Sequence, residues 1–214
     1  MRVLIVFAHP ERASFSAALK DAAVETLAGL GHVVAVSDLY AEGFDAVGGQ
    51  RDMAHRPASP FDYQEEQRRA SRDSTFATDI AERQREVFAC DVLMLNFPMW
   101  WYGPPAILKG WIDRVLAAGF AYDRDRRYAT GQLAGRAGML TVTTGSPPER
   151  YTDVGERSFL TMEQLLRPLQ KGLFHFVGMK GVDPFVAYSA GRVDDARRAR
   201  YLDEYRAHLA REFG

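Results

Sequence analysis

The sequence has little of what would indicate a secreted, membrane-bound or nucleic-acid-binding protein. Its single cysteine, Cys90, cannot form a disulfide within the chain, so we expect a small core residue and a reducing, cytoplasmic setting. Lys and Arg total 27 against 28 Asp and Glu, a balance that argues against a nucleic-acid partner. No apolar stretch is long enough to span a bilayer, and the six apolar residues before His9 are too few for a signal peptide core.

Apolar runs at intervals along the chain predict the strands of a parallel sheet. The first run, Val3–Ala8, is continuous and rich in β-branched residues, which is typical of a strand buried on both faces. Four further candidates are His32–Leu39, Asp91–Phe97, Met139–Thr144 and the shorter Gly172–Val177. Because helical patterns separate most of them, we predict one domain with a three-layer α/β/α architecture, a five-stranded parallel sheet and a ligand crevice at the carboxyl ends of the strands.

Helical spacing and one long polar stretch complete the predicted organisation. A helix is expected after Ser14 and should stop at Gly29 or Gly31, and a second should run through Ile107 to Val115 and end near Gly119. The C-terminal residues 194–213 are expected to form a docked amphipathic helix. Residues 48–79 are polar and much longer than an ordinary connection, so we expect this excursion to be functional or mobile.

The turn after the first predicted strand lacks the glycine-rich fingerprint of a dinucleotide-binding fold of the Rossmann type. It offers hydroxyl groups instead, from Ser14 and Ser16, next to the amides that begin a helix. Free amides and the helix dipole at such a position can receive a phosphate. From this turn alone, a phosphate cradle and a simple helix cap are about equally supported.

Three consecutive aromatic residues follow the third predicted strand. Trp100, Trp101 and Tyr102 stand on a loop between Pro98 and Pro104, where they cannot all point inward. Some of them should line a concave apolar site, which would suit a flat conjugated ligand. The fourth strand ends in Thr143, Thr144 and Gly145, where the backbone can approach a ligand closely, although turn chemistry explains these residues about as well.

Taken in order, these motifs resemble the flavodoxin-like NAD(P)H dehydrogenase (quinone) family, which includes DT-diaphorase, the modulator of drug activity B and the ancillary quinone reductases of the Kef potassium-efflux system. The resemblance covers residues 1 to about 190 and implies a flavodoxin-like fold. The segments that carry it are His9-Pro10-Glu11, Ser14-Phe15-Ser16, Phe97-Pro98 with Trp101, Ala106–Trp111, Phe120-Ala121-Tyr122 and Thr143-Thr144-Gly145.

This resemblance implies a flavin cofactor, with FAD favoured over FMN, and no metal. The family's adenine contact is often made from a dimer partner, and it matches Asp62 and Tyr63 in the segment Phe61-Asp62-Tyr63, so a homodimer is implied as well. Ser16 stands where the family more often has Asn. The remaining implied cofactor residues are His9, Ser14, Phe15, Ser16, Ala17, Pro98, Met99, Trp100, Trp101, Tyr102, Thr143, Thr144, Gly145 and Tyr151.

The resemblance also implies catalytic roles. Tyr151 matches the family's tyrosine that hydrogen-bonds the flavin as negative charge develops, and Trp101, Tyr102 and Tyr122 match residues that position the substrate. Tyr128 aligns less securely with the substrate mouth. The histidine that partners the tyrosine is missing, because residues 156–159 read Glu-Arg-Ser-Phe, and Arg150 or Arg157 is a candidate electrostatic substitute.

We therefore expect a flavin-dependent NAD(P)H:quinone oxidoreductase that works by a ping-pong cycle, in which a nicotinamide cofactor and then a quinone occupy the same flavin face. One alternative is a flavin-binding regulatory subunit of a potassium-efflux system. Another is a flavodoxin-like electron carrier without nicotinamide turnover. Turnover of NADH or NADPH with a quinone distinguishes the enzyme from both.

Overall fold

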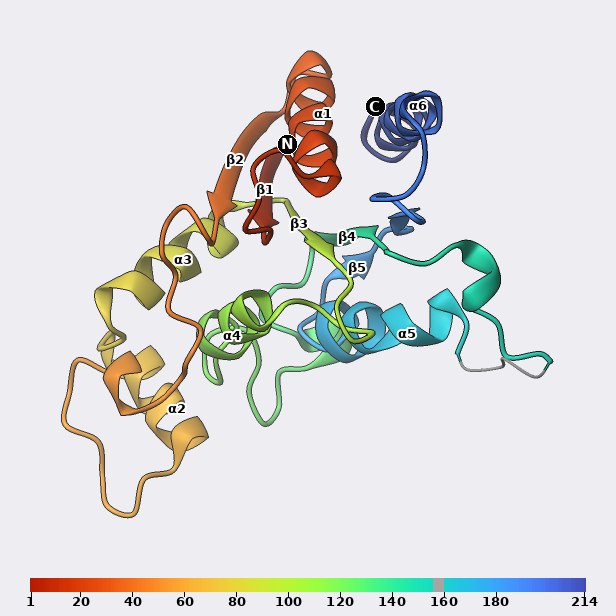
Figure 1. Cartoon of the computed structure of the whole chain (residues 1–214). Coiled ribbons are helices and arrows are strands. Elements are labelled where there is room, and N and C mark those ends of the chain that lie inside the picture. The colour runs from red at the N-terminus through yellow and green to blue at the C-terminus, as the bar shows by residue number, and fades with distance from the viewer. Residues whose placement is uncertain (156–159) are drawn as a thin grey trace.

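A parallel sheet forms the middle layer of the computed structural model, which describes residues 1–155 and 160–214 (Figure 1). Its strands run in the order β2-β1-β3-β4-β5, and β6 also pairs with β4. The predicted three-layer α/β/α architecture is therefore confirmed. The strands are β1 (Arg2–Phe7), β2 (Val33–Asp38), β3 (Val92–Pro98), β4 (Ala137–Thr143), β5 (Lys180–Gly181) and β6 (Phe185–Ala187).

Helices cover both faces of the sheet because successive residues of its inner strands point to opposite faces and are apolar on both. On β1, Val3 and Ile5 pack with α1 and α6, whereas Leu4 and Val6 belong to the core on the opposite face. Figure 1 shows α1 and α6 together on one face, and α3, α4 and α5 on the other. The helices are α1 (Phe15–Gly29), α2 (Tyr63–Asp73), α3 (Thr78–Ala89), α4 (Ala106–Val115), α5 (Met162–Leu169) and α6 (Asp195–Phe213).

The strand expected at residues 172–177 is wrong. These residues lie in and just after η4 (Gln170–His175), a π-helical continuation of α5, and the last strands are β5 and β6. A short apolar run does not distinguish a strand from a buried helix, and here the helix packs Phe174 against β4. The contact is close, since a Cβ at Gly138 would overlap the Phe174 ring.

The polar excursion at residues 48–79 contains a regular helix that its composition concealed. Besides the single turn η1 (Gln50–Asp52), it forms α2 and the start of α3. The side chains that α2 buries belong to Glu66, Gln67 and Ala70, so the helix has no apolar stripe to reveal it. Polar contacts hold it instead, as described below.

Two smaller expectations concern the ends of helices. The C-terminal helix is confirmed: the Asp194 carboxylate accepts from the Arg197 amide at 2.7 Å and caps α6, which buries Tyr205 and Leu209. The helix expected to end near Gly119 ends earlier, at Val115, and a turn follows in which Gly119 has a φ of +87°.

The only cysteine is a buried core residue, as expected, and its thiol donates to the carbonyl of Val87 at 3.2 Å. Burial raises the pKa of Cys90 to about 11, so the thiol stays protonated and unreactive at neutral pH. Within residues 1–155 and 160–214, no helix has both the length and the apolar character needed to cross a membrane.

Candidate functional site

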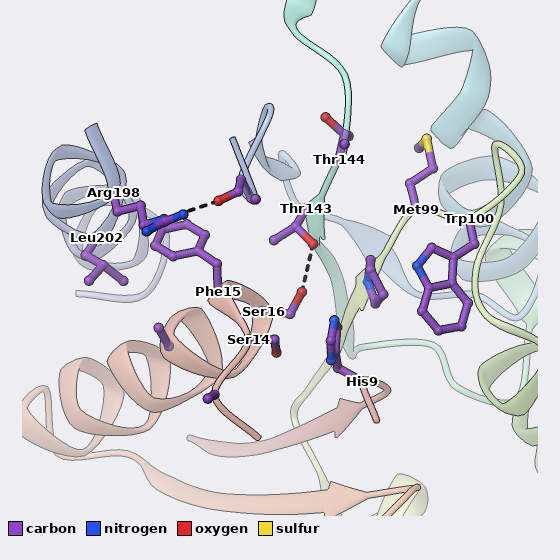
Figure 2. Close-up of a pocket in the computed structure, with 16 residues that line it drawn as sticks. His9, Ser14, Phe15, Ser16, Met99, Trp100, Thr143, Thr144, Arg198 and Leu202 are labelled. Atoms are coloured by element: carbon purple, nitrogen blue, oxygen red, sulfur yellow. Dashed lines mark hydrogen bonds between the residues drawn. The ribbon is translucent and has the colours of Figure 1, made fainter. Parts of the chain in front are cut away.

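A cleft of about 730 Å³ opens at the carboxyl ends of β1, β3 and β4, beside the first turns of α1 and α6 (Figure 2). This is the edge of the sheet where the sequence predicts the ligand crevice. The residues that line it are His9, Ala13, Ser14, Phe15, Ser16, Ala18, Pro98, Met99, Trp100, Thr143, Thr144, Gly145, Ala190, Gly191, Arg198 and Leu202.

The first turn of α1 forms one wall of the cleft. Ser14 caps the helix, and its hydroxyl accepts from the Ala17 amide at 3.2 Å. The amides of Phe15 and Ser16 precede the first intrahelical bond, so the helix leaves them available to an anion. Helix capping and anion binding are thus compatible at this turn.

Two buried hydrogen bonds fix this turn against the sheet. The hydroxyls of Ser16 and Thr143 lie 2.7 Å apart and join the start of α1 to the end of β4 (Figure 2). The side-chain amide of Asn96 donates to the Ser16 carbonyl at 3.3 Å, while its buried Oδ1 has no partner among the residues that the structure describes. A hydrogen bond within the protein therefore joins two motifs that are 127 residues apart in the sequence.

His9 presents a neutral imidazole at the end of β1. Nδ1 lies 2.9 Å from the Glu11 amide and 3.1 Å from the Glu11 carbonyl, so the backbone of Glu11 holds the ring through this atom. Burial lowers the pKa of His9 below its ordinary value, so the ring is uncharged at neutral pH, and in the tautomer that accepts from the Glu11 amide Nε2 carries the proton. The Trp100 ring lies edge-on to it, with 6.4 Å between the ring centroids.

The aromatic loop divides its side chains between the cleft and the outer surface. Trp100 and Gly103 exchange backbone hydrogen bonds at 3.0 Å, which closes a two-residue turn with positive φ at Trp101 (48°) and Tyr102 (63°). Non-glycine residues adopt this conformation at a cost that surrounding contacts must offset. Trp100 lines the cleft as predicted, whereas Trp101 is 97% exposed on the other side of the turn.

The end of β4 forms the opposite wall and is tied to the chain after β6. The Thr144 amide donates to Ala187 at 3.0 Å, the Ala190 amide donates to Thr144 at 3.0 Å, and the Met99 amide donates to Thr143 at 2.8 Å. These bonds bring Ala190 into the cleft wall. Nothing lies within 4 Å of a Cβ built on Gly145, so the wall is open at that point.

Arg198 and Leu202 reach the cleft from α6, and the sequence interpretation missed both. Arg198 donates from Nη1 to Asp195 at 2.9 Å and from Nε to the Ala190 carbonyl at 3.3 Å, and its side chain lies beside the Phe15 ring at the edge of the cleft (Figure 2). The helix reads as an ordinary amphipathic terminal helix. Only the fold shows which of its several arginines meets the cleft.

Several predicted site residues lie outside this cleft. Ala17 is buried behind it, although its amide is held by Ser14. Asp62 caps α2, where its carboxylate accepts from the Glu65 amide at 3.0 Å. The Tyr63 hydroxyl donates to the buried carboxylate of Asp52, which together with burial raises the pKa of Tyr63.

Tyr122 belongs to a second aromatic group, on the loop after α4. Its ring lies 5.2 Å from that of Phe176, which is also 5.6 Å from Tyr128, and Tyr128 lies 5.3 Å from His175. Burial raises the pKa of Tyr122, so its phenol stays protonated at neutral pH. The cleft and this group are two separate surfaces of one chain.

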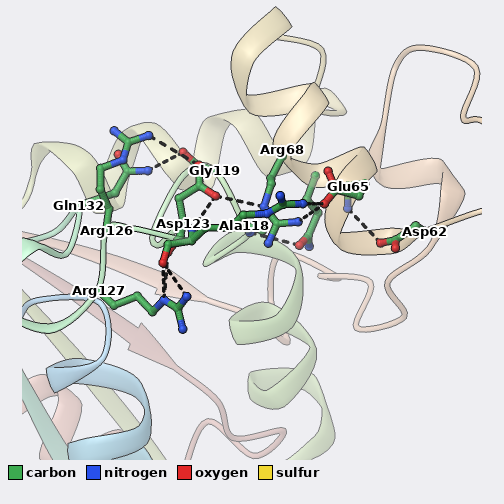
Figure 3. Close-up of polar contacts among 11 residues, drawn as sticks. Asp62, Glu65, Arg68, Ala118, Gly119, Asp123, Arg126, Arg127 and Gln132 are labelled. Carbon is green, nitrogen blue, oxygen red and sulfur yellow. Dashed lines mark hydrogen bonds and ion pairs between the residues drawn. The ribbon is translucent and has the colours of Figure 1, made fainter.

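Residues of α2 hold the Tyr122 loop in place (Figure 3). Arg68 donates to Asp123 at 3.1 Å and to Glu65 at 2.7 Å. Gln67 accepts from the Ala118 amide at 3.1 Å and donates to the carbonyl of Asp113 at 3.2 Å. The polar excursion therefore serves to fix the predicted substrate loop.

Tyr151 follows η3 (Pro148–Arg150) near the end of β4, and its ring centroid lies 5.6 Å from that of Tyr188. The expected position of the missing histidine, including Arg157, falls on residues 156–159, which lie outside the described residues. Over the described part of the chain, no group of three or more His, Cys, Asp or Glu side chains could hold a metal ion.

Comparisons with known proteins show the family and the fold of the chain. The family described as having a flavodoxin-like fold matches residues 1–209. A ribosyldihydronicotinamide dehydrogenase [quinone] of Mus musculus is 41% identical over 97% of this chain and 90% of its own length. The NAD(P)H dehydrogenase [quinone] 1 of Rattus norvegicus is 37% identical over 97% of this chain and 76% of its own length. The crystal structure of a Klebsiella pneumoniae protein, provisionally assigned as a quinone reductase, is 34% identical with a TM-score of 0.93, over 100% of this chain and 85% of that one.

Proposed function

The chain belongs to the flavodoxin-like family that contains the NAD(P)H dehydrogenase (quinone) enzymes, and from this membership we propose that it is a flavin-dependent NAD(P)H:quinone oxidoreductase. One observation carries the proposal. A single cleft combines an anion-binding wall, made by the α1 amides and Arg198, with an aromatic wall at Trp100. A flavin nucleotide has a phosphate group at one end and a flat ring at the other, which match these two walls.

The residues present fit such a group. Hydroxyls of Ser14 and Ser16, together with the first amides of α1, are the donors that a diphosphate needs, and Arg198 adds a positive charge. When bound, the flavin supplies the two-electron chemistry, which takes hydride from one substrate and passes it to the other. The protein's part is to bind, to orient and to exclude water.

The proposed roles of individual side chains follow from their positions. His9 would donate from Nε2, and Pro98, Met99 and Trp100 would face the ring. The backbone amide of Gly145 would bind the polar edge of the ring, since the wall is open at that point. Tyr151, on the same edge of the sheet, would donate a hydrogen bond to the flavin as negative charge develops.

We propose that the flavin is FAD and that two copies of the chain assemble. Asp62 and Tyr63 lie on the excursion, Tyr122 lies on the loop after α4 and Trp101 on the loop after β3, and none of the four lines the cleft. One chain therefore cannot gather all the predicted residues around one ligand, whereas a second copy could bring its own Tyr122 group to the exposed Trp101 and Tyr102. Analytical ultracentrifugation should report a dimer, and a monomer that retains full turnover would contradict this assembly.

Colour and turnover test the central proposal. The purified protein should show flavin absorption, or take up added flavin, and should oxidise NADH or NADPH when menadione is supplied. Flavin released by heat and separated by chromatography distinguishes FAD from FMN. A protein that binds neither flavin would refute the proposal.

The two alternative functions predict other experimental outcomes. An electron carrier would bind flavin but show no steady-state nicotinamide turnover. For a regulatory subunit, binding of a transport protein would be the main output and reductase activity would be secondary. Relatives that are similar over nearly the whole chain carry enzyme names, which favours the reductase.

A further inference from the structure

Tyr188 lies beside Tyr151, where the end of β6 meets the loop that follows β4. The two ring centroids are 5.6 Å apart and the ring planes are inclined by 51°. This is the separation and tilt of a packed aromatic pair. Tyr151 itself is on a loop between η3 and a series of exposed bends, so the ring of Tyr188 is a contact that restrains it.

Tyr188 is held far more firmly than Tyr151. The hydroxyl of Tyr201, a buried residue of α6, accepts from the Tyr188 amide and donates to the Tyr188 carbonyl, both at 3.1 Å. The next residue, Ser189, donates its amide to the Ser146 carbonyl at 3.1 Å. The backbone of Tyr188 is thus fixed from α6 and from the β4 loop, and its ring is a rigid support for the more loosely held Tyr151.

The Tyr188 ring is not simply filling the core. Tyr188 lines a second hollow of about 520 Å³, together with apolar residues such as Met162 and Leu166 and polar ones such as Glu163 and Asp183. Burial first, and then the neighbouring Tyr151, raise the pKa of Tyr188, which keeps its phenol neutral at physiological pH. Tyr188 therefore offers Tyr151 a ring to pack on without adding a charge.

Resting on the proposed function, we infer that Tyr188 is a positioning residue for flavin reduction: its ring orients the Tyr151 phenol so that this phenol can donate to the flavin. Tyr188 transfers neither a proton nor an electron. Tyr151 keeps its proton as well, since it donates only a hydrogen bond. The contribution of Tyr188 is to limit the orientations of one donor before the substrate arrives.

The variants Tyr188→Phe and Tyr188→Leu separate the ring from the hydroxyl. Tyr188→Leu should lower kcat about tenfold, with KM for the nicotinamide changed less than about twofold, because a misplaced donor affects the transition state rather than binding. Tyr188→Phe keeps the ring and should restore most of kcat. With Tyr151→Phe already present, Tyr188→Leu should have little further effect, because both changes remove one interaction.

A second readout needs no turnover. In apoprotein labelled with 3-fluorotyrosine, the fluorine resonance of Tyr151, assigned by its loss in Tyr151→Phe, should shift and narrow toward the free-residue position in Tyr188→Leu. It should hold its wild-type width in Tyr188→Phe and in Tyr40→Leu, a control at an exposed tyrosine after β2. If Tyr188→Leu does not fold, Tyr188→Met, whose unbranched side chain adapts to irregular gaps, removes the ring and is judged by the same two measurements.

The outcomes distinguish this inference from the proposed function. A wild-type protein without quinone turnover would remove the proposed function, whereas an unchanged Tyr151 resonance in Tyr188→Leu would remove the inference alone. Equal losses of kcat in Tyr188→Phe and Tyr188→Leu would show that the hydroxyl acts, not the ring. Additive losses in the double variant with Tyr151→Phe would show that the two tyrosines act independently.

Discussion

The cleft and the α2 region are built on opposite principles. Around the cleft, hydroxyls and backbone amides make most contacts, as in the Ser16–Thr143 pair, and Arg198 brings a charge. In the α2 region, ion pairs connect α2, α3, α4 and the loops between them, among them Arg68 with Asp123 and Arg114 with Asp52. Polar groups of the cleft can therefore bind a charged ligand, whereas the charged side chains of the α2 region mostly pair with one another. Changes in the α2 region should affect stability, and changes in the cleft should affect flavin binding.

The sharpest test of the α2 side is Arg114→Ala. Arg114 is 2% exposed and pairs with Asp52, which is 1% exposed, at 2.9 Å, and it also donates to Asp79 at 3.0 Å. Removing the cation leaves a buried carboxylate unpaired, so the free energy of unfolding should fall by about 3–5 kcal/mol. Urea denaturation measures this loss. Lys109→Ala breaks an exposed pair on the same helix and should cost less than about 1 kcal/mol.

On the cleft side, Arg198→Ala should weaken flavin binding about tenfold to a hundredfold while leaving the unfolding free energy of the apoprotein nearly unchanged. A hydrogen bond to a charged group contributes roughly 1.5–3 kcal/mol, and Arg198 lines the same cleft as the turn where the phosphates would lie. Fluorescence titration of apoprotein with FAD gives the dissociation constant. Arg200→Ala, at an exposed position on the same helix, is the matched control. A large loss of unfolding free energy in Arg198→Ala would contradict the prediction, because it would show that Arg198 stabilises the fold as the α2 ion pairs do.

The same contrast explains what the sequence revealed. Strand ends are marked locally, by His9-Pro10, by Pro98 and by Thr143-Thr144-Gly145, so the cleft walls were predictable from motifs and their order. The helix α2 was not, because its buried residues are polar: Glu66 pairs with His55 within the excursion, and Gln67 bonds Ala118, 51 residues away. The fifth strand was misplaced because a run of apolar residues fits a buried helix equally well. Arg198 was missed because its role depends on where α6 docks.

A smaller effect is expected when the contacts that Arg68 makes with the Tyr122 loop are removed. Arg68→Ala removes the contacts with Asp123 and Glu65 (Figure 3) but leaves the Gln67 hydrogen bonds. The loop should become less ordered, and KM for the quinone should rise about fivefold, which corresponds to roughly 1 kcal/mol, with unchanged FAD affinity. Steady-state kinetics at saturating NADPH measure the KM for the quinone. Arg69→Ala, which removes an exposed cation one residue along, should leave KM as it is.

The smallest expected effect is the pH dependence that His9 gives to the cleft. Burial lowers the pKa of His9 in the folded chain, so the unfolded chain binds a proton first as the pH falls. Stability from this group is therefore complete above pH ~6.5, the ordinary value for imidazole, and is lost as the pH falls through the lower folded pKa. Unfolding free energies measured by urea between pH 5 and 7 should fall slightly more steeply in the wild type than in His9→Gln. Parallel curves would mean that the imidazole is solvated like an exposed one, and the neutral donor assigned to the cleft would then lose its support.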